Sequence, residues 1–151
     1  MHYHVSSDEL TPGTILEPKY GLKIKDPAFY RQSDYCHAQY LKEMIFEDIR
    51  RANHPSRPSR LNSVYLIEKL EDAKKYKEIN GGKHIYEVTL LESSNILIGD
   101  MKWLDLSNRT SMDEMKQIAN YYFQGIPSYN ESEVFWETLY EGQVKIFKKV
   151  E

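Results

Sequence analysis

The sequence predicts an α+β fold in which about three helices pack on a small, mostly antiparallel sheet. Two features of the 151-residue chain lead to this prediction. Short runs of aromatic and β-branched residues lie near both ends, and amphipathic segments lie between them. The strand and helix segments do not alternate in the βαβ rhythm that a parallel sheet requires. The length suits one core, so we expect residues 1–151 to form a single domain.

The strand predictions come from short extended patterns bounded by turn residues. The clearest run, 84–90, alternates along its whole length. Residues 17–21 contain Pro18 and Gly21 and are expected to form a loop. The last two strands are separated by Glu141 and Gly142, which indicate a tight hairpin turn. Strands are expected at residues 3–5, 14–16, 62–67, 84–90, 95–100, 134–139 and 144–147.

Three segments carry the spacing of three and four that is typical of helices. The first is 36–53, and the second half of the basic segment 50–60, which overlaps the end of this helix, is expected to be a loop because it contains two prolines. The second opens at 70–76 and stops at the Asn-Gly-Gly of 80–82, and the third runs from 110–114 to Gly125. The apolar positions of the first helix are Tyr40, Leu41, Met44, Ile45, Ile49 and Ala52.

The composition argues against several protein classes. A net charge of -3 disfavours a dedicated nucleic-acid binder, whose domain is usually basic. The single cysteine, Cys36, cannot form an internal disulfide and fits a reducing compartment. The N-terminus lacks the pattern of a signal peptide, and no apolar run approaches the roughly 18 residues of a membrane span. We therefore expect a cytoplasmic protein with no membrane contact.

Two further residue types bear on partners. The five histidines lack the spacing of metal ligands, so no metal is expected. The 12 tyrosines provide amphipathic surface that would suit a homodimer, although the sequence does not set the oligomeric state.

Three polar residues stand in or beside predicted strands, namely His4, Tyr65 and Glu137. Together they fit the cleavage of NAD between ribose and nicotinamide, in which positive charge builds on the ribose. In this hypothesis His4 supplies a hydrogen bond to the ribose hydroxyls. Tyr65 supplies an aromatic face for the nicotinamide ring, and Glu137 a carboxylate near the reacting carbon.

Neighbouring residues complete the hypothesis. Backbone groups of Val5, with Ser6 beside them, would clamp the nicotinamide amide, and Arg57 and Arg60 would pair with the pyrophosphate. Each residue also has a plainer interpretation. His4 fits a surface histidine, and Tyr65 fits a core tyrosine. Glu137 fits a solvent-facing strand residue, for which Glu133 and Glu141 are close competitors. Arg57 and Arg60 fit a solvated loop.

These segments also resemble a known superfamily. Residues 3–7, Tyr-His-Val-Ser-Ser, with the Leu, Gly and Pro that follow, resemble the start of the small bacterial ADP-ribosyltransferases that modify rifampin. Residues 63–66 resemble the Val-Tyr-Leu strand of those enzymes, and 83–88 match their next strand. Residues 137–146 look like the closing element of the wider superfamily, where the catalytic glutamate precedes a short strand. The set is similar to the His-Tyr-Glu class, which includes poly(ADP-ribose) polymerases and diphtheria toxin, and to an uncharacterised bacterial and phage family of this superfamily.

The resemblance, which reaches from residue 3 to about 150, implies an ADP-ribosyltransferase-like fold with a split sheet. It implies a glycosyltransferase that uses NAD as co-substrate without a metal, passes ADP-ribose to an acceptor and releases nicotinamide. The acceptor, whether small molecule, protein or nucleic acid, is not set by the sequence. The catalytic residues would be His4, Tyr65 and Glu137, and NAD would be bound by His4, Val5, Ser6, Arg57, Arg60 and Tyr65.

The sequence also departs from the family pattern. Val5 stands where the family has glycine, which favours an alternative, an inactive NAD- or nucleotide-binding module of the same fold. Phe135 replaces the first glutamate of the Glu-x-Glu pair found in arginine-modifying toxins, which argues against arginine as acceptor. A second alternative is an RNA 2'-phosphotransferase, in which Arg31, Arg57 and Arg60 would imitate the arginine set of that group.

Overall fold

Two antiparallel sheets form the framework of the molecule in the computed structural model, which describes residues 1–106, 110–128 and 134–151. One sheet has the strand order β1-β4-β7-β2 and the other the order β3-β6-β5. All pairings between these described strands are antiparallel, so the predicted α+β class and antiparallel pairing are confirmed. The strands are β1 (His2–Ser6), β2 (Ile15–Leu16), β3 (Val64–Leu66), β4 (His84–Leu90), β5 (Ile96–Asp100), β6 (Trp136–Tyr140) and β7 (Val144–Lys149).

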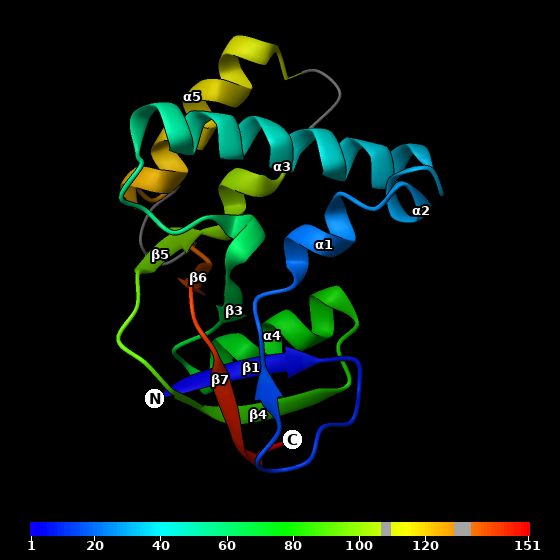
Figure 1. Cartoon of the computed structure of the whole chain (residues 1–151), viewed down its shortest axis with the longest axis vertical. Helices are drawn as coiled ribbons and strands as arrows, with labels where there is room; N and C mark the ends of the chain where they lie inside the picture. The colour runs from blue at the N-terminus through cyan, green and yellow to red at the C-terminus, as the bar shows by residue number, and fades with distance from the viewer. Residues whose placement is uncertain (107–109, 129–133) are drawn as a thin grey trace.

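The two sheets meet where β1 passes β3. Tyr3 and Ile67 exchange two backbone hydrogen bonds, with N–O distances of 2.8 and 2.9 Å. In Figure 1 the sheet that contains β1 lies below and the sheet that contains β6 lies above. The residues next to this junction are therefore adjacent in space, although Tyr3 and Ile67 are 64 positions apart in the chain.

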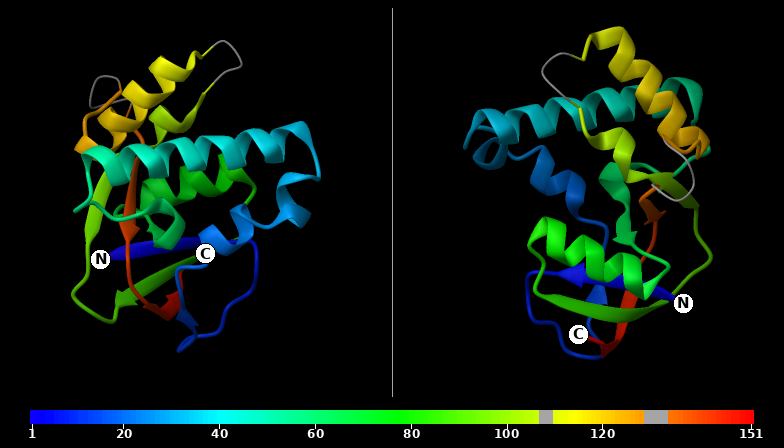
Figure 2. Two further views of the ribbon diagram at one scale, coloured as in Figure 1. Left: turned by 45° about the horizontal axis from the view of Figure 1, so that its top comes forward. Right: turned by 180° about the vertical axis from the view of Figure 1, so that it is seen from behind.

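Helices cover both sheets. The long helix α3 crosses the upper sheet with α5 beside it, whereas α4 flanks the lower sheet along β1 (Figure 1 and Figure 2). No helix of the described residues is long and apolar enough to cross a membrane. The helices are α1 (Tyr20–Ile24), α2 (Pro27–Tyr30), α3 (Asp34–Asn53), α4 (Leu70–Asn80) and α5 (Met112–Gln124), with two 3₁₀ turns, η1 (Arg60–Asn62) and η2 (Met101–Leu104).

The three helices predicted from the sequence are confirmed as α3, α4 and α5, and their ends follow the local sequence. The Ser33 side chain accepts a hydrogen bond from a backbone N–H of the first turn of α3. Ser111 and Glu114 form a capping box at the start of α5. Gly81 and Gly125 end α4 and α5 in the left-handed conformation, each with φ of 74°.

The loop predicted at 17–21 is partly wrong, because Tyr20 and Gly21 begin α1. Helix α2 was not predicted either, although Asp26 caps it and Pro27 stands at its first position. Helix α1 has no side-chain cap and depends on packing against η1. A four- or five-residue helix of this kind leaves too short a pattern to recognise in a sequence.

The hairpin predicted at Glu141 and Gly142 is also wrong. Strand β6 pairs with β3 and β5, whereas β7 pairs with β4 and β2, so the chain crosses from one sheet to the other at this point. The physical reason is that the two strands serve different cores. Leu139 of β6 packs with the aromatic residues of α3 and α5, and Ile146 of β7 packs in the other sheet's cluster.

The helix α3 has the predicted extent but a different buried face. Leu41 is 46% exposed and Ala52 is exposed, although both were expected to face the core. The buried residues are instead Glu43, Phe46 and Glu47. Two acidic residues can be buried here because each receives hydrogen bonds from an arginine.

We expect Gly21→Ala to destabilise the protein by about 1–3 kcal/mol, because a Cβ on Gly21 would lie 2.6 Å from the backbone oxygen of Leu61. This penalty opposes the gain of about 1 kcal/mol that alanine brings to a helix. Chemical denaturation measures the difference. The control is Leu22→Ala, which truncates a side chain that is 76% exposed and should change stability by less than about 0.5 kcal/mol. Equal stability of Gly21→Ala and wild type would contradict the close packing of α1 on η1.

Candidate functional site

A cleft of about 640 Å³ lies between the helices above and the sheet below. Residues of α1, α3 and η2 form its upper side, and residues of β1 and α4 form its lower side. The view from behind in Figure 2 shows how these elements are arranged. The cleft is lined by His4 of β1, Tyr65 of β3 and Glu137 of β6. The three residues singled out in the sequence therefore share one cavity, and its volume is typical of small-molecule sites.

The strand register explains why these side chains converge. Tyr65 is paired with Leu139, and Glu137 precedes Leu139 by two positions on the same strand, so the side chains of Tyr65 and Glu137 project from one face of the sheet. Gly99 of β5 lies opposite Glu137, and a Cβ there would lie 2.7 Å from the ring of Tyr122. The glycine therefore admits the Tyr122 ring beside Glu137.

His4 is held by the backbone of the neighbouring sheet. Its Nδ1 lies 3.2 Å from the carbonyl oxygen of Tyr65. Because a carbonyl oxygen only accepts hydrogen bonds, Nδ1 carries the proton and the neutral ring presents Nε2 as an acceptor. Burial lowers the pKa of His4, although the bond to the Tyr65 carbonyl opposes this shift. A neutral His4 is suited to accept a hydrogen bond from a ligand hydroxyl.

Glu137 is not a free carboxylate but part of a buried ionic cluster. Its Oε1 accepts a hydrogen bond from the hydroxyl of Tyr122 at 2.6 Å and another from the guanidinium of Arg60. Arg60 also binds Glu43, with Nε–Oε2 and Nη2–Oε1 distances of 3.0 and 3.1 Å. Each of the three charged residues is at most 6% exposed, and the one cation, Arg60, offsets part of the charge of the two carboxylates.

Two aromatic rings enclose the Arg60 guanidinium. Its carbon lies 5.1 Å from the ring centre of Tyr65 and 5.2 Å from that of Tyr122, which are cation–π distances. Burial opposes the charge of Arg60, but Glu43 and the other anionic neighbours keep its pKa above the ordinary value. Burial likewise raises the pKa of Tyr65 and Tyr122, so both hydroxyls stay protonated and act as donors.

Two contacts fix the orientation of the Tyr65 side chain, one at its hydroxyl and one at its ring. Its hydroxyl donates to the backbone oxygen of Arg60 at 2.6 Å, and its ring meets that of Tyr20 edge to face at 5.2 Å between centroids. Tyr20 in turn donates to Glu43 at 3.3 Å. The ring in the cleft is therefore rigidly placed by the same cluster that holds Glu137.

The other residues predicted to bind NAD fall into two groups, those that line the cleft and those that lie outside its lining. Val5 lines the cleft, whereas Ser6 lies outside its lining, and its hydroxyl accepts a bond from the backbone of Asp8. Arg57 is exposed and lines neither of the two described clefts, whereas Arg60 lines the first one. The expectation of a solvated loop is wrong for Arg60, which belongs to η1 and is buried against two carboxylates.

The competitors of Glu137 can be placed in part. Glu141 faces a different cavity, where its Oε1 accepts a hydrogen bond from the backbone of Ser59 at 2.5 Å. Glu133 lies outside the described residues. Sequence reasoning missed Glu43, Lys42 and Tyr122. Glu43 and Glu47 stand four positions apart on the first predicted helix, and an arginine-rich segment follows them. This pattern was the available signal for the buried ion pairs.

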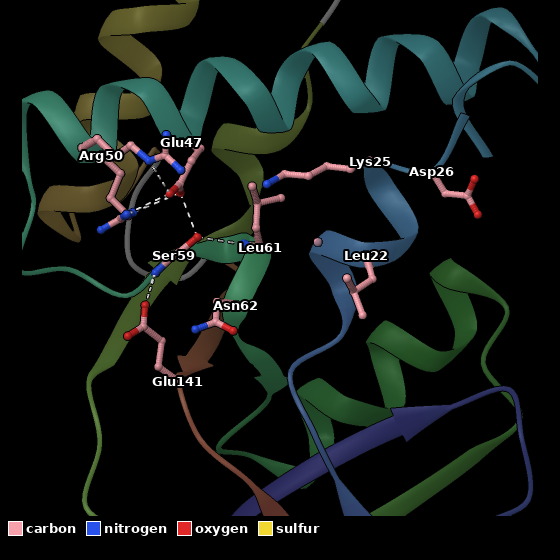
Figure 3. A pocket seen from close by; sticks show the side chains of 11 residues that line it. Leu22, Lys25, Asp26, Glu47, Arg50, Ser59, Leu61, Asn62 and Glu141 are labelled. Atoms are coloured by element: carbon pink, nitrogen blue, oxygen red, sulfur yellow. Dashed lines mark hydrogen bonds and ion pairs between the residues drawn. The ribbon is translucent and has the colours of Figure 1, made fainter. Parts of the chain in front are cut away.

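The second cleft, of about 690 Å³, lies on the other side of α1 and η1 and shares no lining residue with the first. Figure 3 shows that Glu47, Arg50, Ser59 and Glu141 form a chain of hydrogen bonds along one side of it. Glu47 accepts hydrogen bonds from Arg50 at 2.8 Å and from the Ser59 hydroxyl at 2.8 Å. Burial would raise the pKa of Glu47, but these two donors lower it below its ordinary value. These hydrogen bonds tie Ser59, which precedes η1, to helix α3, so the polar groups on this side of the cleft help to hold the fold together.

The family described as Protein of unknown function (DUF2441) matches residues 13–151. The chain belongs to this family. The matched segment contains Tyr65 and Glu137. It begins after β1, so His4 lies outside it. No curated protein matches the sequence.

We expect Arg60→Met to lower the stability of this DUF2441 chain by about 3–5 kcal/mol, because Glu43 and Glu137 would remain buried without their cation. Urea denaturation with circular dichroism measures the loss. Arg57→Met is the matched control and should change stability by less than about 0.5 kcal/mol, since the Arg57 side chain is exposed. Similar effects of the two substitutions would contradict the buried cluster.

We also expect the imidazole of His4 to titrate below its ordinary value of 6.5, because burial disfavours its charged form. The unfolded chain then gains this proton before the folded chain does, so stability falls as pH drops below about 6.5. Long-range proton–nitrogen NMR correlation spectra report the midpoint and should place the proton of the neutral ring on Nδ1. A midpoint at or above 6.5, or a neutral ring protonated on Nε2, would contradict the geometry described for His4.

Proposed function

We propose that the protein is an ADP-ribosyltransferase that cleaves NAD, releases nicotinamide and passes ADP-ribose to an acceptor. The observation that carries the proposal is the meeting of His4, Tyr65 and Glu137 in one cleft. They come from three strands in the chain order of the His-Tyr-Glu class. The two antiparallel sheets, which meet beside the cleft, agree with the split sheet expected of an ADP-ribosyltransferase-like fold and support the proposal.

In the proposed reaction, the bond between nicotinamide nitrogen and the anomeric carbon of ribose breaks, and its electron pair stays with nicotinamide. Nicotinamide leaves as a neutral base, and the ribose becomes an oxocarbenium-like cation. An acceptor O–H or N–H then attacks the same carbon and loses its proton. The products are nicotinamide, the ADP-ribosylated acceptor and one proton, so atoms and charge balance.

The roles follow from the environment of each residue. His4 accepts a hydrogen bond from a ribose hydroxyl through Nε2, since Nδ1 is directed to the Tyr65 carbonyl. Tyr65 presents its fixed ring to nicotinamide, and Val5 lies beside His4 in the lining. The hydrogen bonds that the described residues give Glu137 end on Oε1, which leaves Oε2 for the ribose or the acceptor proton. Ser6 and Arg57 stay predictions without a contact to this cleft.

One observation favours the alternative of an inactive nucleotide-binding module. The Arg60 guanidinium is bound to Glu137, and a carboxylate paired with one cation stabilises a second cation less. The RNA 2'-phosphotransferase alternative receives less support. Arg31 and Arg57 are exposed and line neither cleft, so they do not form an arginine set with Arg60.

The test is release of nicotinamide from NAD by the purified protein and by Glu137→Gln. We expect slow release by wild type and a loss of about 100-fold or more in the variant, since the amide cannot take the acceptor proton. The control is Glu141→Gln, which lies in the other cleft and can still accept the bond from Ser59. It should release nicotinamide at the wild-type rate.

The outcomes separate the alternatives. Binding of NAD without release of nicotinamide would favour the binding module. Equal rates for Glu137→Gln and wild type would remove Glu137 from the mechanism. NAD labelled in its adenine distinguishes transfer from hydrolysis, because transfer leaves the label on another molecule and hydrolysis leaves free ADP-ribose.

A further inference from the structure

The charges that line the cleft differ from those of the whole chain. Four cationic residues and three acidic residues line it, although the chain has a net charge of -3. Two of the acidic residues, Glu43 and Glu137, are bound to Arg60. The remaining charges of the lining are Lys23, Lys42 and Lys102 against Asp105. The four cationic and three acidic residues give the lining a net charge of +1, and the three lysines lie on its upper side, on α1, α3 and η2, where they would attract an anionic ligand.

The three lysines have no carboxylate partner among the described residues. None of them takes part in the ion pairs found in residues 1–106, 110–128 and 134–151. Lys42 donates only to a neutral partner there, the amide oxygen of Gln39 at 2.7 Å. Burial lowers the pKa of Lys42, while the carboxylates of Glu43, Glu137 and Asp105 oppose that shift. A partly buried ammonium that has no ion pair among the described residues gains from an anion that enters the cleft.

Lys42 belongs to a stripe of α3 that runs along the cleft. Tyr35, Gln39 and Lys42 follow one another at spacings of four and three, so they lie on one face of the helix, and all three line the cleft. The rise of an α-helix places Tyr35 about 10 Å along the axis from Lys42. Glu43, the next residue, reaches the Arg60 cluster. The stripe thus passes from the exposed rim to the buried carboxylates.

The rim carries two large exposed side chains. Tyr35 of α3 is 71% exposed and Ile79 of α4 is 74% exposed, and both line the cleft from its opposite sides. A tyrosine ring in this position offers a face on which a planar base can stack. The arrangement provides an aromatic face at the rim and a cation further in, which is the order of base and diphosphate in a nucleotide.

We propose that Lys42 binds the diphosphate of a nucleotide whose base packs against Tyr35 at the rim of the cleft. Lys23 and Lys102 add long-range attraction for the same group. This assignment replaces the expected contact of Arg57 and Arg60 with pyrophosphate, since Arg57 lies outside the cleft and Arg60 is bound to two carboxylates. The proposal rests on the function proposed above in placing the ADP part of NAD in this cleft, but ADP alone tests it.

The experiment is isothermal titration calorimetry of the whole chain with ADP and with inorganic diphosphate at one ionic strength. We expect Lys42→Met to weaken the binding of both ligands about tenfold or more, because one charged hydrogen bond to phosphate is lost. The control is Lys25→Met, which removes an exposed lysine of the second cleft and should bind as wild type does. Thermal unfolding checks that each variant is folded.

A second variant separates the base from the phosphates. Tyr35→Ala should weaken ADP about tenfold and leave inorganic diphosphate unchanged, since only ADP has a base to stack. Equal loss for both ligands would overturn the placement of the base at Tyr35. Absence of ADP binding to wild type, or wild-type affinity in Lys42→Met, would overturn the diphosphate site.

Failure of this site and failure of the proposed transferase give different results. If ADP binding depends on Lys42 and no nicotinamide is released from NAD, the nucleotide site stands and the transferase proposal falls. If Lys42→Met releases nicotinamide with an unchanged KM for NAD and Glu137→Gln does not release it, the transferase stands and the diphosphate site falls.

Discussion

The buried guanidinium of Arg60 is the group on which the arrangement of the cleft depends. It joins Glu43 of α3, Glu137 of β6 and Tyr122 of α5, and its ring contacts include Tyr65 of β3. Four elements that are remote in sequence thus meet at one cation. A buried ion cluster of this kind stabilises less than its contacts suggest, because three charges have lost their water. Its main effect is to fix how these elements are oriented.

The same cluster limits what the site can do. Because Oε1 of Glu137 is fixed by two donors, the carboxylate has one orientation, and the other oxygen is the atom left for a ligand. Preorganised groups of this kind lose little freedom when a ligand binds. The charge of Arg60 at the same time offsets part of the negative charge that Glu137 would present to a cationic group in the cleft. In the proposed reaction the fixed orientation of the carboxylate favours catalysis, whereas its pairing with Arg60 opposes it.

The cleft has two kinds of surface with separate origins. The deep end is built from strands and the buried cluster, so its groups are fixed. The rim is built from the overhanging end of α3 and the last turn of α4, where Tyr35 and Ile79 are exposed. Lys42 lies between these two regions on the same helix face as Tyr35. A nucleotide that extends from the rim to the deep end would contact both surfaces.

The sequence by itself determined the local elements and the chemistry of single residues. The alternation at 84–90, the capping box at Ser111 and the glycines after α4 and α5 act over a few residues, so they were readable before any tertiary contact was known. The chain order of His4, Tyr65 and Glu137 can likewise be read directly from the sequence. The tertiary structure alone decided that β6 and β7 belong to different sheets and that Arg60 is buried while Arg57 is exposed. It also decided that Glu43 faces inward from α3. These outcomes depend on which distant charges meet, and pairing over tens of residues leaves no local period in a sequence.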